Sequence, residues 1–176
     1  VKESAVTAKN LNCQYMIIAS GFRLPDATDE EHFTFALNAL RQVADIATEH
    51  GVTLLLEPLN TEVDHPGMYL NSVSTGLNLV EAVNSPALRL VYDAYHSLVM
   101  GDDIAKVLKG RMQWVAHIQV ADMPGRGAPG TGNIDWSSVL NMLEEEGYKG
   151  WIGLEFKLNE LSSIDAVNQA KRLLQQ

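Results

Sequence analysis

The stretch LVYDAYH, residues 90–96, runs from apolar, strand-like chain directly into Asp93 and, three positions later, into His96. Burying an acid and an imidazole at the end of a strand costs free energy unless the groups have polar partners or the strand end is exposed to solvent. This stretch therefore predicts a strand whose carboxyl end carries polar side chains that bind a partner. Other strands of the chain end in a similar way.

The composition limits the classes of protein to consider. The chain has 176 residues, of which 46% are hydrophobic and 20% charged, and this suits a single globular domain with a sizeable core. A net charge of −9 disfavours nucleic acid as a partner. The single cysteine, Cys13, excludes a disulfide framework and is typical of a reducing cytoplasm. The sequence shows no signal-peptide pattern and no apolar run of about 18 residues, so we expect a cytoplasmic protein without a membrane partner.

Strand and helix patterns alternate along the chain. The strand signals are short apolar runs at residues 13–21, 52–57, 88–93, 114–121 and 151–156. Helical patterns follow at residues 28–50, 74–83, 102–109, 135–147 and 162–174; the first has a capping box of Thr28 and Glu31 and is followed by Gly51. Residues 3–11 also read as the end of a helix, so we expect residues upstream of Val1 to be missing.

This alternation indicates an α/β fold with a parallel sheet and helices outside it. Two architectures satisfy the pattern, a doubly wound sheet and a (β/α)₈ barrel. A dinucleotide-binding sheet would carry a glycine-rich motif after its first strand. The approximation in this sequence, Gly125 to Gly132, follows a late strand instead and is a weak signal.

Four successive predicted strands carry an oxygen-donor side chain at or near the carboxyl end: Glu57, Asp93, Gln119 and Glu155. In a barrel, those ends converge on one mouth, where active sites lie. Three carboxylates there would repel one another unless a cation or protons lay among them. Hard oxygen donors without a thiolate favour Mg²⁺ or Mn²⁺.

A single acid at a strand end is more often a helix N-cap or a salt-bridge partner, but four in succession favour a shared site. Beside Asp93, His96 is predicted to contact substrate. His117 is expected to pack inside the fold, whereas His32 and His50 are expected to be solvated.

Four segments carry a family resemblance: LLLEPLNTEVDHPGMYL (54–70), LVYDAYHSLVMGDD (90–103), VAHIQVADMPGRGAPGTGNIDW (115–136) and EEGYKGWIGLEF (145–156). Together they resemble the xylose isomerase-like TIM-barrel superfamily, and within it the hydroxypyruvate isomerase-like sugar isomerases and epimerases. The resemblance extends in order over residues 11–156.

The resemblance implies a (β/α)₈ TIM barrel. Residues 1–176 would form a single partial domain covering about the last five βα units, strands four to eight, with the N-terminal strands missing. It also implies that His96 and Arg126 contact the substrate and that Glu57 and Glu155 are the catalytic acid/base pair. The implied metal ligands are Glu57, Asp93, Gln119 and Glu155. The sequence departs from the family pattern at three positions. Gln119 stands where many members carry histidine, Leu98 where a polar residue is often found, and Ala128 where an acidic residue is common.

These residue types suit proton transfer next to a carbonyl group. A divalent ion stabilises an enediolate, and a carboxylate on each side of the substrate can remove and return the proton. We therefore expect a metal-dependent isomerase or epimerase of a small ketose, hydroxy-aldehyde or keto acid. Arg126 could clamp a substrate carboxylate through two hydrogen bonds.

Three alternatives stay open: an inosose-type sugar dehydratase, a metal-dependent phosphodiesterase acting on abasic DNA, and a non-catalytic binding barrel. The phosphodiesterase would need more histidines at strand ends and a basic face. The sequence does not determine the exact substrate, the native metal, or whether the protein is a homo-oligomer.

Overall fold

The computed structural model describes residues 1–174, which contain one sheet of five parallel strands in chain order. The strands are β1 (Tyr15–Ile18), β2 (Thr53–Leu56), β3 (Leu88–Asp93), β4 (Val115–Val120) and β5 (Ile152–Leu154). Each pairs in parallel with the next, so every connection is a crossover that carries the chain back along the sheet. Every strand predicted from the sequence is present.

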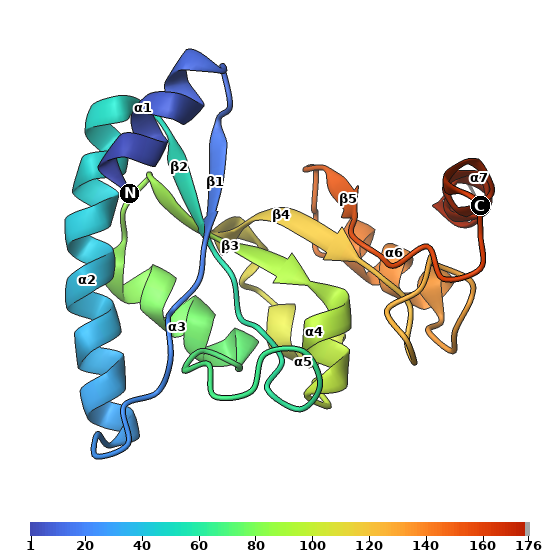
Figure 1. The fold of residues 1–176 in the computed structure, drawn as a ribbon, viewed down its shortest axis with the longest axis horizontal. Coiled ribbons are helices and arrows are strands. Elements are labelled where there is room, and N and C mark those ends of the chain that lie inside the picture. Colours follow the sequence, from blue (N-terminus) through green and yellow to red (C-terminus); the bar gives the residue numbers. More distant parts are fainter. Residues whose placement is uncertain (175–176) are drawn as a thin grey trace.

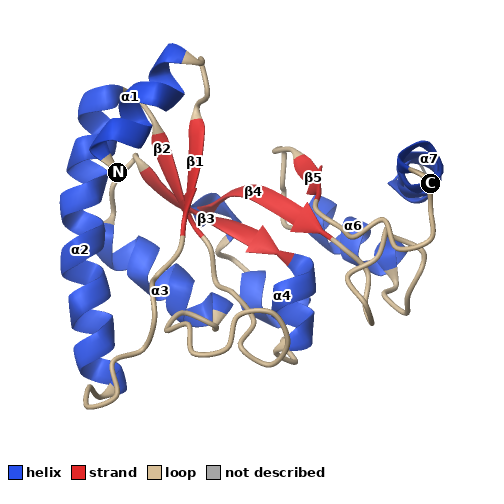
Figure 2. Ribbon diagram, in the orientation of Figure 1, coloured by secondary structure: helices blue, strands red, loops and turns tan. Residues whose placement is uncertain are grey.

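The crossovers are helical, as the alternation predicts. The helices are α1 (Lys2–Asn10), α2 (Asp29–His50), α3 (Val73–Val83), α4 (Ala94–Val99), α5 (Ile104–Leu108), α6 (Trp136–Glu145) and α7 (Ser163–Leu174), with a 3₁₀ turn, η1, at Met112–Trp114. Figure 1 shows α1, α2 and α3 gathered beside β1–β3, and Figure 2 shows α6 and α7 beyond β5. The sequence did not predict α4, which begins immediately after β3.

Local signals fix both ends of the long helix α2. The Thr28 side chain accepts from the backbone N–H of Glu31, and the Glu31 carboxylate accepts from the backbone N–H of Thr28, so the predicted capping box forms. At the other end Gly51 takes a left-handed conformation with φ of 68°. A glycine has no Cβ to oppose that conformation, and this explains why the helix stops there.

The two faces of the sheet differ. Alternate residues on one face join the apolar core under the helices, among them Leu54, Leu56, Leu88, Leu90, Tyr92, Ile118 and Val120. Gly76 of α3 lies so close to Leu90 that a Cβ there would come within 2.9 Å of its Cδ1 atom, so this glycine lets α3 settle onto β3. The opposite face carries the residues between these, including Leu55, Val91 and Asp93.

Both edges of the sheet are unpaired within residues 1–174, because β1 pairs only with β2 and β5 only with β4. Large apolar side chains are exposed at these edges: Ile17 on β1, Leu154 on β5, and Trp151 just before β5 at 81% exposure. Unpaired, apolar edge strands can pair with strands of other chains, and folded proteins usually cover or protect them. The sheet therefore has the form of an open, curled part of a barrel wall.

The expectation that His32 is solvated is wrong. Its Nε2 atom accepts from the backbone N–H of Leu24 at 2.8 Å, and its ring stacks on Tyr69 with centroids 4.9 Å apart. The contacts come from segments outside α2, so the helix pattern alone gave no sign of them.

None of the helices in the described part of the chain is long and apolar enough to cross a membrane.

Candidate active and metal-binding site

The predicted polar side chains lie along one edge of the sheet. Asp93 is the last residue of β3 and is in register with Gln119 of β4. Glu57 directly follows β2 and donates its backbone N–H to Ile18, and Glu155 directly follows β5 and donates its own to Val120. Parallel pairing thus brings the carboxyl ends of four adjacent strands to the same level.

Asp93 has two roles in the structure, one for each carboxylate oxygen. Oδ1 accepts from the backbone N–H groups of Tyr95 and His96 and caps α4. Oδ2 is buried without a hydrogen-bond partner among the described residues, 3.8 Å from both His96 Nε2 and Arg126 Nη2. The N-cap interpretation and the site interpretation both apply to this residue. Because Oδ2 is desolvated and unpaired, it is the strongest indication of a ligand here.

Glu57, Asp93 and His96 each offer a ligand atom within 4.8 Å of the others. Burial, together with the charges of Asp93 and Glu155, raises the pKa of Glu57 to about 7, against the charge of Arg126. Burial also raises the pKa of Asp93 to about 7, against the hydrogen bond from His96 and the charge of Arg126. Two carboxyl groups in this position need either protons or a cation.

Gln119 and Glu155 complete the row in different surroundings. Gln119 is buried, and its Oε1 atom has no hydrogen-bond partner in the part of the chain that is described. The Glu155 side chain is 48% exposed and lies 3.3 Å from Arg126 Nη2. Gln119 therefore joins the site through its register beside Asp93, and Glu155 joins it through Arg126.

Arg126 lies between the acids, although it belongs to the long loop after β4. Its guanidinium group lies 5.2 Å from the centre of the Tyr95 ring and contacts both Asp93 and Glu155. The loop is anchored by the buried Asp122, whose carboxylate accepts from three backbone N–H groups and from the Trp136 indole. The sequence interpretation missed Asp122. Its position directly after a buried strand and before a glycine-rich loop was the available signal.

His96 is buried and neutral near pH 7. Burial lowers its pKa to about 4, and the nearby charges of Arg126 and His65 act in the same direction. Its Nδ1 atom faces Asn60, a fully buried residue three positions after Glu57 that the sequence interpretation also missed. A polar residue so close behind a strand end was the signal that could have identified it.

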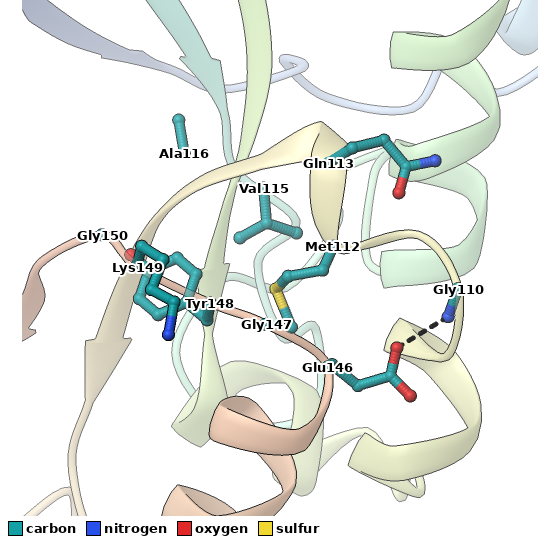
Figure 3. Close-up of a pocket in the computed structure, with 10 residues that line it drawn as sticks. All are labelled: Gly110, Met112, Gln113, Val115, Ala116, Glu146, Gly147, Tyr148, Lys149 and Gly150. Carbon is teal, nitrogen blue, oxygen red and sulfur yellow. Dashed lines mark hydrogen bonds between the residues drawn. The ribbon is translucent and has the colours of Figure 1, made fainter.

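A separate cavity lies at the opposite end of the strands. Figure 3 shows its lining by segments 110–116 and 146–150, where the Glu146 carboxylate accepts from the backbone N–H of Gly110. Lys149 is the other charged side chain of this lining, and none of the predicted site residues belongs to it. Among the described residues, the buried and unpartnered atoms Asp93 Oδ2, His96 Nε2 and Gln119 Oε1 thus lie at the other end of the sheet from this cavity.

Comparisons with known proteins agree with this geometry. A family model described as xylose isomerase-like TIM barrel matches residues 1–176. The chain is 32% identical over 153 residues to hydroxypyruvate isomerase of Escherichia coli, and this covers 87% of the chain and 57% of that protein. It is 35% identical over 131 residues to 2-oxo-tetronate isomerase of Cupriavidus necator, covering 74% of the chain and 47% of that protein.

Among solved structures, the crystal structure of an AP endonuclease, family 2, from Brucella melitensis superposes with a TM-score of 0.81 at 28% identity. The match covers 91% of this chain and 62% of that one. The chain thus spans about half to three fifths of the length of these relatives. The parallel five-stranded sheet, the row of polar strand ends and the family match lead to one conclusion: the chain belongs to the xylose isomerase-like TIM-barrel family.

Proposed function

We propose that this chain carries the catalytic half of a divalent-metal-dependent isomerase or epimerase acting on a small ketose, hydroxy-aldehyde or keto acid. The observation that carries the proposal is the buried Asp93 Oδ2, which has no hydrogen-bond partner among the described residues and lies beside Glu57 and His96 at the carboxyl ends of parallel strands. The similarity to hydroxypyruvate isomerase and 2-oxo-tetronate isomerase supports the reaction class.

The residues present suit a hard divalent ion. Asp93 Oδ2 and Gln119 Oε1 are buried oxygen atoms without hydrogen-bond partners in the described part of the chain, and Glu57 has a carboxyl group whose pKa is raised by burial and by neighbouring acids. Oxygen donors of this kind suit Mg²⁺ or Mn²⁺. We assign the ligand set to Glu57, Asp93, Gln119 and Glu155. When bound, such an ion supplies positive charge that stabilises an enediolate.

Glu57 and Glu155 are the proposed proton-transfer pair. They follow β2 and β5, with β3 and β4 between them, so a small substrate over the strand ends would lie between the two carboxylates. A carboxyl group with a pKa of about 7, as in Glu57, can both take and return a proton near neutral pH. Removal of a proton next to a carbonyl and its return to the neighbouring carbon, or to the opposite face, gives isomerisation or epimerisation.

His96 and Arg126 are the proposed substrate contacts. The neutral His96 has a ring nitrogen, Nε2, that has no hydrogen-bond partner within residues 1–174 and lies 3.8 Å from Asp93 Oδ2, where it can donate to a substrate oxygen. Arg126 offers a guanidinium group to a carboxylate or hydroxyl group, since its side chain is held on Tyr95 at the open side of the site. A carboxylate on the substrate would compete with Glu155 for this arginine.

We further propose that residues 1–176 form one partial domain whose five strands are strands four to eight of a (β/α)₈ barrel. The unpaired edges at β1 and β5 and the exposed Ile17 and Leu154 support this position, because three further βα units would cover them. The catalytic residues would then all lie in the half of the barrel described here.

The test uses the full-length protein with Mn²⁺ or Mg²⁺ in D₂O and a panel of C3–C6 ketoses and keto acids, with an inosose and abasic DNA as parallel substrates. NMR would follow deuterium uptake at the carbon next to the carbonyl and the appearance of isomer. Uptake with isomer formation is the expected result. Net loss of water from an inosose would identify a dehydratase, cleavage of abasic DNA a phosphodiesterase, and no turnover of any substrate a binding barrel; each of these contradicts the proposal.

A further inference from the structure

Asn60 is held by its own loop in a single orientation. Its side-chain Oδ1 accepts from the backbone N–H groups of Val63 and Asp64, each at 3.0 Å. An amide reversed by 180° would direct its NH₂ group at two backbone donors, so the two contacts assign oxygen and nitrogen without ambiguity. The NH₂ group must therefore point toward the other neighbours of Asn60.

Those neighbours are a carboxylate and an imidazole. Asn60 Nδ2 donates to Asp64 Oδ2 at 2.9 Å and lies 2.6 Å from His96 Nδ1. The backbone N–H of Asn60 also points at His96 Nδ1, at 3.3 Å. Both of these nitrogen atoms carry hydrogen and neither can accept, so His96 Nδ1 must be the acceptor.

An imidazole that accepts at Nδ1 carries its single proton at Nε2. Among the described residues, Nε2 has no hydrogen-bond partner, and it lies 3.8 Å from Asp93 Oδ2 at the mouth of the site. A nitrogen that bears a proton has no lone pair for a metal ion. His96 is thus a hydrogen-bond donor in this site, even though it offers a ring nitrogen within 4.8 Å of carboxylate oxygens of Glu57 and Asp93.

We propose that Asn60 is a positioning residue, which fixes His96 in the Nε2–H tautomer so that the ring donates to a substrate oxygen and stays out of the metal ligand set. The tautomer follows from the contacts alone. Its use on a substrate rests on the function proposed above.

The same loop connects His96 to the other substrate contact. Asp64 Oδ2 accepts from both Asn60 Nδ2 and the Tyr95 hydroxyl group, the latter at 2.9 Å, and Tyr95 lies under the Arg126 guanidinium group. Lys157 lies 3.8 Å from the other oxygen of Asp64. The Asn60–Asp64–Tyr95 contacts thus hold the imidazole and the guanidinium group relative to each other.

The direct test is the tautomer of His96 in the full-length, metal-free protein with ¹⁵N-labelled histidine. Long-range ¹H–¹⁵N NMR should show a pyridine-type nitrogen at Nδ1 and a protonated, pyrrole-type nitrogen at Nε2. The Asn60→Asp variant replaces the NH₂ donor with an acceptor and should shift the population toward the Nδ1–H form. Asn71→Asp is a matched control in the same loop, because Asn71 contacts Thr61 instead of the imidazole, and should leave the tautomer unchanged.

Activity gives the second measurement. Asn60→Asp should lower kcat/KM about tenfold, as expected for one lost hydrogen bond to substrate. In a His96→Ala background the same change should have little further effect, whereas a merely structural role would add its full cost again.

The outcomes separate the two proposals. A proton at Nδ1 of wild-type His96, or an Asn60→Asp variant with the wild-type tautomer, would overturn the role of Asn60. If Asn60→Asp does not fold, the wild-type spectrum decides the tautomer by itself. The expected tautomer in a full-length protein that turns over none of the panel would leave the geometry intact and remove the proposed function.

Discussion

The two glutamates proposed for proton transfer lie at unlike ends of one row. Glu57 follows β2, beside the well-buried strand β3, and it is partly buried next to Asp93. Glu155 follows β5, a strand of three residues with no buried member, and its side chain is 48% exposed beside Arg126. On the packed side, burial and neighbouring acids raise the pKa of Glu57. On the open side, Glu155 forms an ion pair with Arg126. The same residue type thus has two environments because the sheet is packed unevenly.

The largest expected effect comes from removing either acid. Glu57→Gln and Glu155→Gln should each lower turnover by about 10²–10⁴-fold, the usual contribution of a general acid or base. Circular dichroism and thermal unfolding should show that both variants keep the fold, since both side chains lie at the mouth of the sheet. A variant that kept more than about a tenth of the wild-type turnover would contradict the acid/base role of its residue.

A pair of leucines tests the difference in packing. Leu90→Ala on β3 removes a fully buried side chain and should lower the free energy of unfolding by about 2–5 kcal/mol. Leu154→Ala on β5 removes an exposed one and should change it by no more than about 0.5 kcal/mol. Urea unfolding of residues 1–176 measures both.

The same pair in the full-length protein sharpens the comparison. If further βα units cover β5, the cost of Leu154→Ala should rise well above its value in residues 1–176. An equal, small cost in both proteins would argue against the proposed position of these strands in a barrel.

Metal binding should depend on the packed side of the row. Asp93→Asn removes a charged oxygen donor and should weaken Mn²⁺ binding by on the order of tenfold or more, measured by calorimetry on full-length protein at pH 8. Asp103→Asn is a suitable control, because Asp103 caps α5 and pairs with Lys106 away from the site. Unchanged affinity in Asp93→Asn would remove Asp93 from the ligand set.

The smallest effect is a pH dependence of the metal-free protein. Asp93 and Glu57 have pKa values of about 7 in the fold, above the ordinary values of 3.8 and 4.5. A raised carboxyl pKa means that the folded state binds more protons than the unfolded one, so stability is greatest below the ordinary pKa and falls as the pH rises through 7. We therefore expect these two carboxyl groups to lower the melting temperature of the metal-free protein as the pH rises from 5 to 8.

Two additions test the origin of that pH dependence. Glu57→Gln should flatten the curve, because it removes one titrating group and the repulsion that it exerts on Asp93. Saturating Mn²⁺ should reverse the loss at pH 8, since the ion takes the place of the protons. A metal-free protein that became more stable from pH 5 to pH 8 would show that these carboxyl groups are not held in the protonated form.

Much of the fold follows from local patterns in the sequence. Apolar runs of strand length, the capping box of Thr28 and Glu31, and Gly51 after the helix are all signals between residues close in the chain, and each element that they predict is present. The short helix α4 was not predicted because AYHSLV has no clear helical period, and for its cap, Asp93, the shared-site interpretation was preferred to the N-cap interpretation. In the structure Asp93 uses one oxygen for the cap and leaves the other for the site.

The candidate site was also partly readable. The sequence predicted that Glu57, Asp93, Gln119 and Glu155 stand at or near strand ends, and the parallel register brings those ends together; their role as a shared site stays a prediction. It could not give the contact between Asn60 and His96, which are 36 residues apart, or the burial of His32 under Tyr69. Such contacts depend on how two loops fold over the same strand ends, and no local pattern encodes that.

The sequence by itself determined which side chains reach the carboxyl ends of the strands, because strand alternation and the point where an apolar run stops are properties of neighbouring residues. Only the tertiary structure decided what those side chains can do. The pKa of about 7 at Glu57, the unpaired Oδ2 of Asp93 and the accepting Nδ1 of His96 arise from burial and from partners on other strands and loops. Desolvation and hydrogen bonding act through space, so the chemistry of these residues is set where distant segments meet.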